Sequence, residues 1–98
     1  MNDGGYTEVM EVEDDDEIKT ITYQMKEKVE KQLGETLVIF EPILYRKQIV
    51  NGINYKVKVY IGDEKYIHLR IHVPPIYSST PIILLESEPD KTFFDPLD

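Results

Sequence analysis

The sequence predicts an α+β domain in which one amphipathic helix is followed by four antiparallel strands. Two patterns support this prediction. Apolar residues recur every three or four positions near the N-terminus, and they recur at every second position further along the chain. The first period is that of a helix and the second is that of half-buried strands. Because such strands bury one face of a sheet, we expect the apolar stripe of the helix to cover that face.

The helix is expected over residues 15–33. The acidic residues 14–16 are suitable N-caps, and their negative charges favour the positive end of the helix dipole. Gly34 follows the last apolar residue and suits the left-handed position after a helix. Charged side chains cover the face opposite the apolar stripe. The stripe consists of Ile18, Ile21, Met25, Val29 and Leu33.

Alternating apolar residues after Gly34 predict the strands. Their expected ranges are 38–50, 53–61, 65–73 and 82–88. Pro42 lies inside the first range and has no amide hydrogen for a ladder, so a bulge or an edge position is expected there. The last eight residues, KTFFDPLD, contain apolar side chains that we expect to hold the C-terminus against the domain.

The turns between these strands define the two ends of the sheet. Asn51-Gly52 predicts a two-residue hairpin turn of type I′, because both residues tolerate the positive φ that this turn needs. In a meander of four strands, the turns at 50–53 and 74–81 lie at the same end of the sheet. The turn at 62–64 lies at the opposite end.

Length and charge indicate one domain, residues 1–98, with residues 1–13 as a flexible N-terminal arm that has no helix or strand period. The net charge of −8 is uneven, because residues 1–17 hold eight acidic side chains and no Lys or Arg. The remaining acids and bases balance, so we expect no nucleic-acid binding, which needs a basic patch. The longest apolar runs have four residues, and we therefore expect no contact with a membrane.

The chain offers little for catalysis, so it is not expected to be an enzyme. It has no cysteine, which excludes a disulfide, a thiolate nucleophile and a Cys-based metal site. His68 and His72 share a strand face but are about 13 Å apart, too far to bind one metal. Ser78 and Ser79 lack the G-x-S-x-G pattern of a nucleophile elbow, so a small hydrolase is the weakest interpretation. No cofactor and no metal are expected.

The expected cellular location follows from two features that the sequence lacks. The start of the sequence, MNDGG, has no basic region followed by an apolar run, as a secretory signal would. The lack of cysteine suits a reducing compartment. We therefore expect a cytoplasmic protein.

Three segments are expected to be exposed although they suit water poorly. They are the Gly4-Gly5 pair of the arm, the hairpin tip at 49–52 and the turn at 74–77, which reads PPIY. The last two lie at one end of the predicted sheet. Exposed apolar residues that gather at one edge indicate a binding surface.

The segment Gln48-Ile49-Val50-Asn51-Gly52 resembles the Q-x-V-x-G motif of the type 1 cystatins, also called stefins. The stretch that follows, INYKVKVYIGDEKYIHLRI, is similar to the same region of that family, and Gly4-Gly5 resembles its N-terminal glycine. The resemblance covers nearly the whole chain. It implies a twisted antiparallel sheet of four to five strands wrapped around one long N-terminal helix. The lack of cysteine favours type 1 over the disulfide-bonded type 2.

The resemblance also implies a function, which is reversible, non-covalent inhibition of papain-like cysteine proteases of the cathepsin type. The arm and two hairpin loops would block the active-site cleft. The implied protease-binding residues are Gly4, Gly5, Gln48, Ile49, Val50, Asn51, Gly52, Pro74, Pro75 and Ile76.

The sequence departs from the family pattern at two places. Asp3 precedes the first glycine, where an apolar residue or proline is common, and Pro75-Ile76 stands where a Leu-Pro pair is usual. A cystatin-fold binding module without strong protease inhibition is therefore the alternative. A monomer is expected, with strand exchange into a dimer as the other option.

Overall fold

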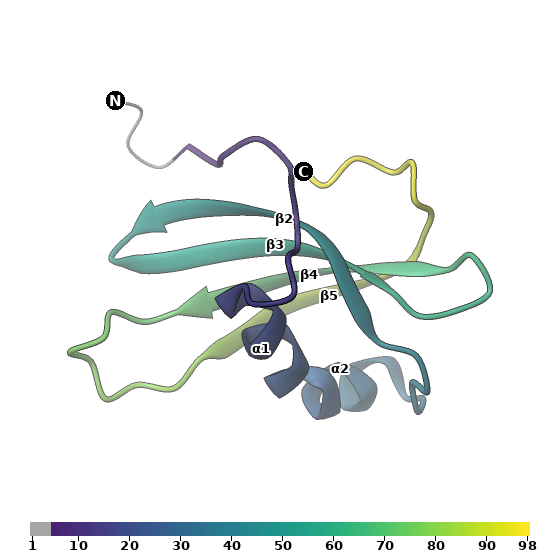
Figure 1. Cartoon of the computed structure of the whole chain (residues 1–98). Helices are drawn as coiled ribbons and strands as arrows, with labels where there is room; N and C mark the ends of the chain where they lie inside the picture. Colours follow the sequence, from purple (N-terminus) through teal and green to yellow (C-terminus); the bar gives the residue numbers. More distant parts are fainter. Residues whose placement is uncertain (1–4) are drawn as a thin grey trace.

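The computed structural model describes residues 5–98 and has one five-stranded antiparallel sheet with the strand order β1-β2-β3-β4-β5. Figure 1 shows the twisted sheet with both helices against one of its faces. The predicted α+β class and the packing of sheet against helix are confirmed. The elements are β1 (Met10–Glu11), α1 (Glu17–Gln24), α2 (Lys26–Leu33), β2 (Glu41–Val50), β3 (Gly52–Tyr60), β4 (Tyr66–Val73) and β5 (Ile83–Lys91).

The prediction of one long helix is wrong in one detail, because Met25 separates α1 from α2. The amide of Met25 donates to the carbonyl oxygen of Thr22 at 3.0 Å, which is the tighter 3₁₀ spacing. Thr22 in turn donates its hydroxyl to the carbonyl oxygen of Ile18, and such a bond bends a helix. The C-terminal end is as predicted, with Gly34 in the left-handed region at φ 73°. The N-cap is Asp16, one of the expected acidic residues, but the helix begins at Glu17, two residues after the predicted start.

The core lies between the helices and the inner face of the sheet, as the two periods predict. The helical stripe contributes buried Ile18, Ile21, Met25 and Val29. The sheet contributes the alternating residues that are fully buried: Val57, Val59, Ile67, Leu69 and Ile71. Each such side chain stabilises the fold by about 1.5–3 kcal/mol relative to its exposed state.

The start of the sheet differs from the expectation that residues 1–13 lack regular structure. Met10 and Glu11 form β1 and pair with Tyr45 and Leu44 of β2. Two residues are too few to show a strand period, which explains why the sequence did not predict them. The bulge expected at Pro42 is confirmed, since the register of β2 and β3 shifts between Pro42 and Leu44.

The outer face of the sheet is more covered than its polar sequence indicates. The C-terminal tail, residues 92–98, lies over it, and Lys58 and His68 are buried there. The Nζ of Lys58 donates to the carbonyl oxygens of Thr92, at 3.1 Å, of Phe93, and of Asp95, at 2.7 Å. Burial lowers the pKa of Lys58. Leu97, which is 4% exposed, completes the cover, so the expected attachment of the C-terminus is confirmed.

Candidate functional site

Two loops lie together at one end of the sheet, which is the left end in Figure 1. The first loop, residues 48–52, is the tip of the β2–β3 hairpin and includes the end of β2 and the first residue of β3. The second loop, residues 74–82, joins β4 to β5. The turn at residues 61–65 lies at the opposite end. The placement of these turns follows the prediction from strand direction.

The tip of the first loop exposes its aliphatic side chains. Ile49 is 57% exposed and Val50 is 39% exposed, although both belong to the last part of β2. Val50 pairs with Gly52, so Asn51 alone spans the turn. The predicted type I′ turn is wrong, because Gly52 has a φ of 103° but Asn51 is not among the described residues with positive φ.

Gly52 holds the first loop against the end of β4. A Cβ atom at this position would lie 2.4 Å from the carbonyl oxygen of Val73 and 3.2 Å from the Cα of Pro74. Both atoms belong to the backbone and cannot move aside like a flexible side chain. The close approach of the two loops therefore requires glycine.

The second loop presents Ile76 and Tyr77, which are fully and 83% exposed, while Pro74 and Pro75 are half-buried. The hydroxyl of Tyr77 donates to Oδ1 of Asn51 at 3.2 Å, so a hydrogen bond joins the two tips. Tyr77 is absent from the predicted site residues. Its position in the exposed PPIY turn was the signal that could have included it.

A row of polar side chains supports the first loop from the outer face of the sheet. The Nδ2 of Asn54 donates to Oε1 of Gln48 at 2.9 Å, and Nδ1 of His72 lies 2.6 Å from Oδ1 of Asn54. Because the Asn54 oxygen is an acceptor, the histidine nitrogen must donate. Gln48 of the predicted motif therefore faces β3 and β4, and its side chain contacts the framework of the loop.

The N-terminal arm runs beside β2 toward the first loop. Tyr6 forms a bridge with Gln48, and the amide of Thr7 donates to the carbonyl oxygen of Lys47 at 2.8 Å. The pairing is antiparallel, so the chain from Tyr6 back to Gly5 heads toward the tip. Gly5 is half-buried and has no regular secondary structure, whereas the predicted site residue Gly4 lies outside the described residues.

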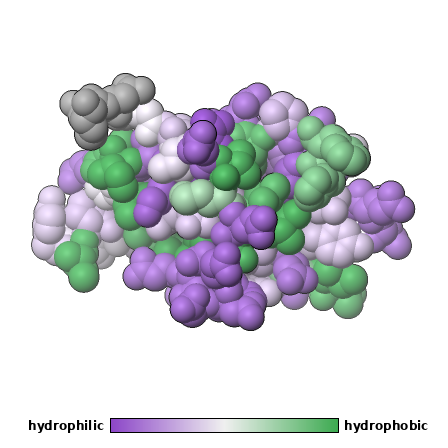
Figure 2. All heavy atoms as spheres, turned by 45° about the horizontal axis from the view of Figure 1, so that its top comes forward, coloured by the Kyte–Doolittle hydropathy of each residue, from purple (hydrophilic) through white to green (hydrophobic). Residues whose placement is uncertain are grey.

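The surface view agrees with this geometry. In Figure 2, hydrophobic groups lie at the left end of the molecule, where Figure 1 has both hairpin tips, and a second group lies at the right end. Hydrophilic side chains form the lower part of the surface between them. Further hydrophobic areas in Figure 2 lie between the two ends of the molecule, whose dimensions are 38 × 28 × 23 Å.

Comparison with known proteins identifies the family of this chain. The family model of the cystatin domain matches residues 4–78. The chain belongs to the cystatin family. Its relatives include type 1 members of the family, as the resemblance implied. The matched residues include both the Gln48–Gly52 motif and the start of the second loop.

Three relatives indicate how far the similarity extends. Leukocyte cysteine proteinase inhibitor 1 of Sus scrofa is 36% identical over 81 residues, 83% of this chain and 79% of the relative. Cystatin-A of Bos taurus is 37% identical over 81 residues, 83% of each chain. Cystatin-A3 of Dictyostelium discoideum is 48% identical over 56 residues, 57% of this chain and 58% of the relative. The first relative is named as an inhibitor and none of the three is named as an enzyme.

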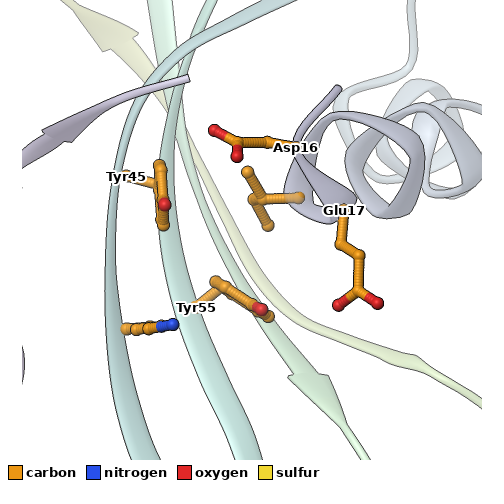
Figure 3. Close-up of a pocket in the computed structure, with 6 residues that line it drawn as sticks. Asp16, Glu17, Tyr45 and Tyr55 are labelled. Carbon is orange, nitrogen blue, oxygen red and sulfur yellow. The ribbon is translucent and has the colours of Figure 1, made fainter. Parts of the chain in front are cut away.

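This cystatin also has a small pocket between the start of α1 and the strands β2 and β3. Its volume is about 210 Å³, and Figure 3 shows Asp16 on the side of Tyr45 and Glu17 on the side of Tyr55. Burial raises the pKa of both tyrosines, and the nearby carboxylates raise it further. Both phenols therefore stay protonated near neutral pH and do not act as bases.

Residues 5–98 contain neither a metal-binding cluster nor a membrane-spanning helix. No group of three or more His, Cys, Asp or Glu side chains in this range could hold a metal ion. No helix in the same range is long and apolar enough to cross a membrane.

Proposed function

We propose that this cystatin reversibly inhibits papain-like cysteine proteases by inserting the end formed by the arm and the two loops into the active-site cleft. The observation that carries the proposal is the pair of exposed aliphatic tips fastened to each other. Ile49 and Val50 protrude from one loop and Ile76 from the other. The name of the porcine relative, a cysteine proteinase inhibitor, supports the choice of target class.

The geometry favours tight binding because the loops are ordered before they meet a partner. The fit of Gly52 under Val73 and the bond from Tyr77 to Asn51 restrict both tips. A rigid binding surface loses little conformational freedom on association. Apolar area that enters the cleft then contributes about 25 cal/mol per Å² removed from water.

Each segment has a role in the proposal. The arm with Gly4 and Gly5 lies along the non-primed subsites, where a residue without a side chain permits close passage. Gln48, Ile49, Val50, Asn51 and Gly52 form the central wedge, and Pro74, Pro75 and Ile76 contact the primed side. No inhibitor atom forms a covalent bond, so the blocking is steric. Cathepsin-type targets, a monomeric inhibitor and a cytoplasmic location, which suits a chain without cysteine, complete the proposal.

The first test is a titration of active papain with the purified protein. We expect nanomolar or tighter inhibition, with full recovery of enzyme activity and of the free active-site thiol after dissociation. An absence of inhibition at micromolar concentration would reject the proposal and favour the binding module without protease inhibition.

The second test compares two valines at opposite ends of the molecule. Val50→Asp places a charge on the wedge, where transfer out of water is costly, so we expect affinity for papain to fall at least about 100-fold. Val38→Asp is the matched control, because Val38 is 92% exposed and lies beside the distant turn at Gly62. It should leave inhibition unchanged. Equal effects of the two changes would contradict the assigned binding end.

A further inference from the structure

The arm is attached to the sheet by few contacts. Its strand β1 has two residues and forms the edge of the sheet, and nearer the loops only the bridge between Tyr6 and Gln48 continues the ladder. Thr7 adds two bonds to Lys47, one from its amide and one to its hydroxyl oxygen. Short edge pairings are weak alone, so side chains must help to hold the arm at the loops.

Arg46 contacts both ends of the chain. Its Nε donates to the carbonyl oxygen of Thr7 at 2.8 Å, and its Nη1 donates to the carbonyl oxygen of Leu97 at 2.9 Å. Nη1 is also 3.9 Å from a carboxylate oxygen of Asp98. The guanidinium is planar and its donors point in several directions, so one side chain bridges two segments. Figure 1 shows the two segments side by side above β2.

The ring of Tyr6 adds a further contact between the arm and the guanidinium of Arg46. The Cζ atom of Arg46 lies 5.7 Å from the centre of the Tyr6 ring, and Nζ of Lys56 lies 4.3 Å from it. Both distances are suitable for a cation–π interaction. The residues directly after Gly5 are therefore held by cations that rise from the outer face of the sheet.

The two segments that Arg46 joins differ in how firmly they are fixed. The C-terminal tail is anchored by buried Leu97 and by the three carbonyl groups that bind Lys58. The arm near Thr7 has no comparable anchor among the described residues. Arg46 therefore transmits the position of the fixed tail to the weakly held arm.

We propose that Arg46 is a positioning residue through which the C-terminal tail orients the N-terminal arm for protease binding. Its role in binding rests on the function proposed above. The positioning itself is a property of the free protein and is tested separately, so the failure of one can be told from the failure of the other.

The first experiment measures amide hydrogen exchange by NMR in the free protein. In Arg46→Gln, we expect the Thr7 amide to exchange about tenfold faster, because charge-assisted bonds to both chain ends are lost. Core amides such as that of Val59 should keep their rates, which shows that the fold is intact. Arg70→Gln is the matched control, since Arg70 lies on the same sheet face and forms an ion pair with Glu86 rather than with the described ends of the chain. Equal Thr7 exchange in Arg46→Gln and the wild type would overturn the proposal.

The second experiment tests whether the C-terminal tail helps to position the arm. Lys58→Met removes the donor for the tail carbonyls while keeping an unbranched side chain, and it should also accelerate exchange of the Thr7 amide. In the double variant, Lys58→Met should not accelerate Thr7 exchange beyond the rate of Arg46→Gln, because Arg46→Gln already removes the contact between the tail and the arm. Additive effects of the two changes would overturn the link to the tail. If Lys58→Met does not fold, Leu97→Ala replaces it in the same cycle.

The third experiment measures dissociation from papain. Arg46→Gln should raise the dissociation rate in the full-length chain and have no effect once residues 1–5 are removed. In Arg46→Lys, one ammonium nitrogen replaces the several donor nitrogens of the guanidinium, so this variant should restore slow dissociation only in part. A rate increase that persists without the arm would overturn the proposal. Faster Thr7 exchange in a protein that does not inhibit papain would reject the proposed function and leave the positioning role standing.

Discussion

Both ends of the sheet expose apolar side chains, but the two ends are built differently. At the loop end, Ile49, Val50 and Ile76 project from tips that are joined by backbone packing and by the Tyr77–Asn51 bond. At the opposite end, aromatic rings pack on one another. The centroid distances are 5.2 Å for Tyr60 and Tyr66, 5.9 Å for Tyr66 and Phe93, and 5.4 Å for Phe93 and Phe94.

This difference shows that exposure alone does not identify a binding site. The rings at the distal end already have apolar neighbours, and Nζ of Lys58 lies 5.4 Å from the Phe93 ring centre. At the loop end, Ile76 is fully exposed and Ile49 is 57% exposed, so burial in a partner would remove their apolar area from water. Three predictions test the contrast, from the largest expected effect to the smallest.

The largest effect is expected for Gly52→Ala. The new methyl group would meet the carbonyl oxygen of Val73 at 2.4 Å in a strained backbone with φ of 103°. We expect a loss of about 3 kcal/mol or more in the free energy of unfolding, because backbone must move to relieve the clash. Urea unfolding and papain inhibition measure the two consequences, and inhibition should weaken at least about 100-fold.

Gly62→Ala is the matched control at the distal end. Its φ of 95° is similar, but the nearest atom to an added methyl is the flexible end of Ile39 at 3.2 Å. We expect about 1–2 kcal/mol of destabilisation from backbone strain and unchanged inhibition. Similar losses at the two glycines would contradict the special role of the loop contact.

The second prediction concerns the loss of folding stability at acidic pH. The pKa of His68 is lowered to about 4, mainly by burial and also by Lys58 and Lys91, while Asp95 and Asp98 act in the opposite direction. The pKa is lower in the folded protein than the usual 6.5, so protonation favours unfolding. Between pH 6.5 and pH 4 the protein should therefore lose about 2–3 kcal/mol of stability.

Urea unfolding at pH 7 and pH 4 measures this loss, with His68→Gln as the comparison. The variant keeps all carboxylates, so the extra loss in the wild type isolates the histidine. Amides of the C-terminal tail should lose protection at pH 4, measured against the intrinsic exchange rate at each pH, whereas protection of the Gly52 amide should change less. Identical pH dependence in the wild type and His68→Gln would show that burial of His68 has no such effect.

The smallest effect is expected for Tyr77→Phe. The change removes one solvent-exposed hydrogen bond to Asn51 and keeps the ring, which corresponds to about 0.5–1 kcal/mol. The dissociation rate from papain should rise about two- to fivefold, as measured by displacement with excess substrate. Phe94→Ala changes an equally exposed ring at the distal end and should leave that rate unaltered. A larger effect at Phe94 would reverse the assignment of the two ends.

The sequence predicted the features that depend on periodicity. The inner face of the sheet, from Val57 to Ile71, is buried as the alternation indicated, and the motif at Gln48 lies on a hairpin as expected. Helix ends at Asp16 and Gly34 followed from local chemistry. Each of these predictions uses neighbours along the chain, which one sequence contains.

The sequence could not predict features that depend on distant contacts. Lys58 and His68 have the pattern of exposed polar residues, and only the tail that returns over them explains their burial. The bond between Tyr77 and Asn51 joins residues from different hairpins. The turn at Asn51 was predicted from residue preference, but the fit against Val73 determines where a positive φ is needed.

The close fit of Gly52 beneath Val73 has a practical consequence for engineering new specificities. A combinatorial library on this scaffold should hold Gly52, Asn51 and Tyr77 constant, since they set the distance between the tips. Diversity belongs at Ile49, Val50 and Ile76, whose side chains face solvent. Selection from such a library would vary the chemistry of the contact surface while the spacing of the two tips stays constant.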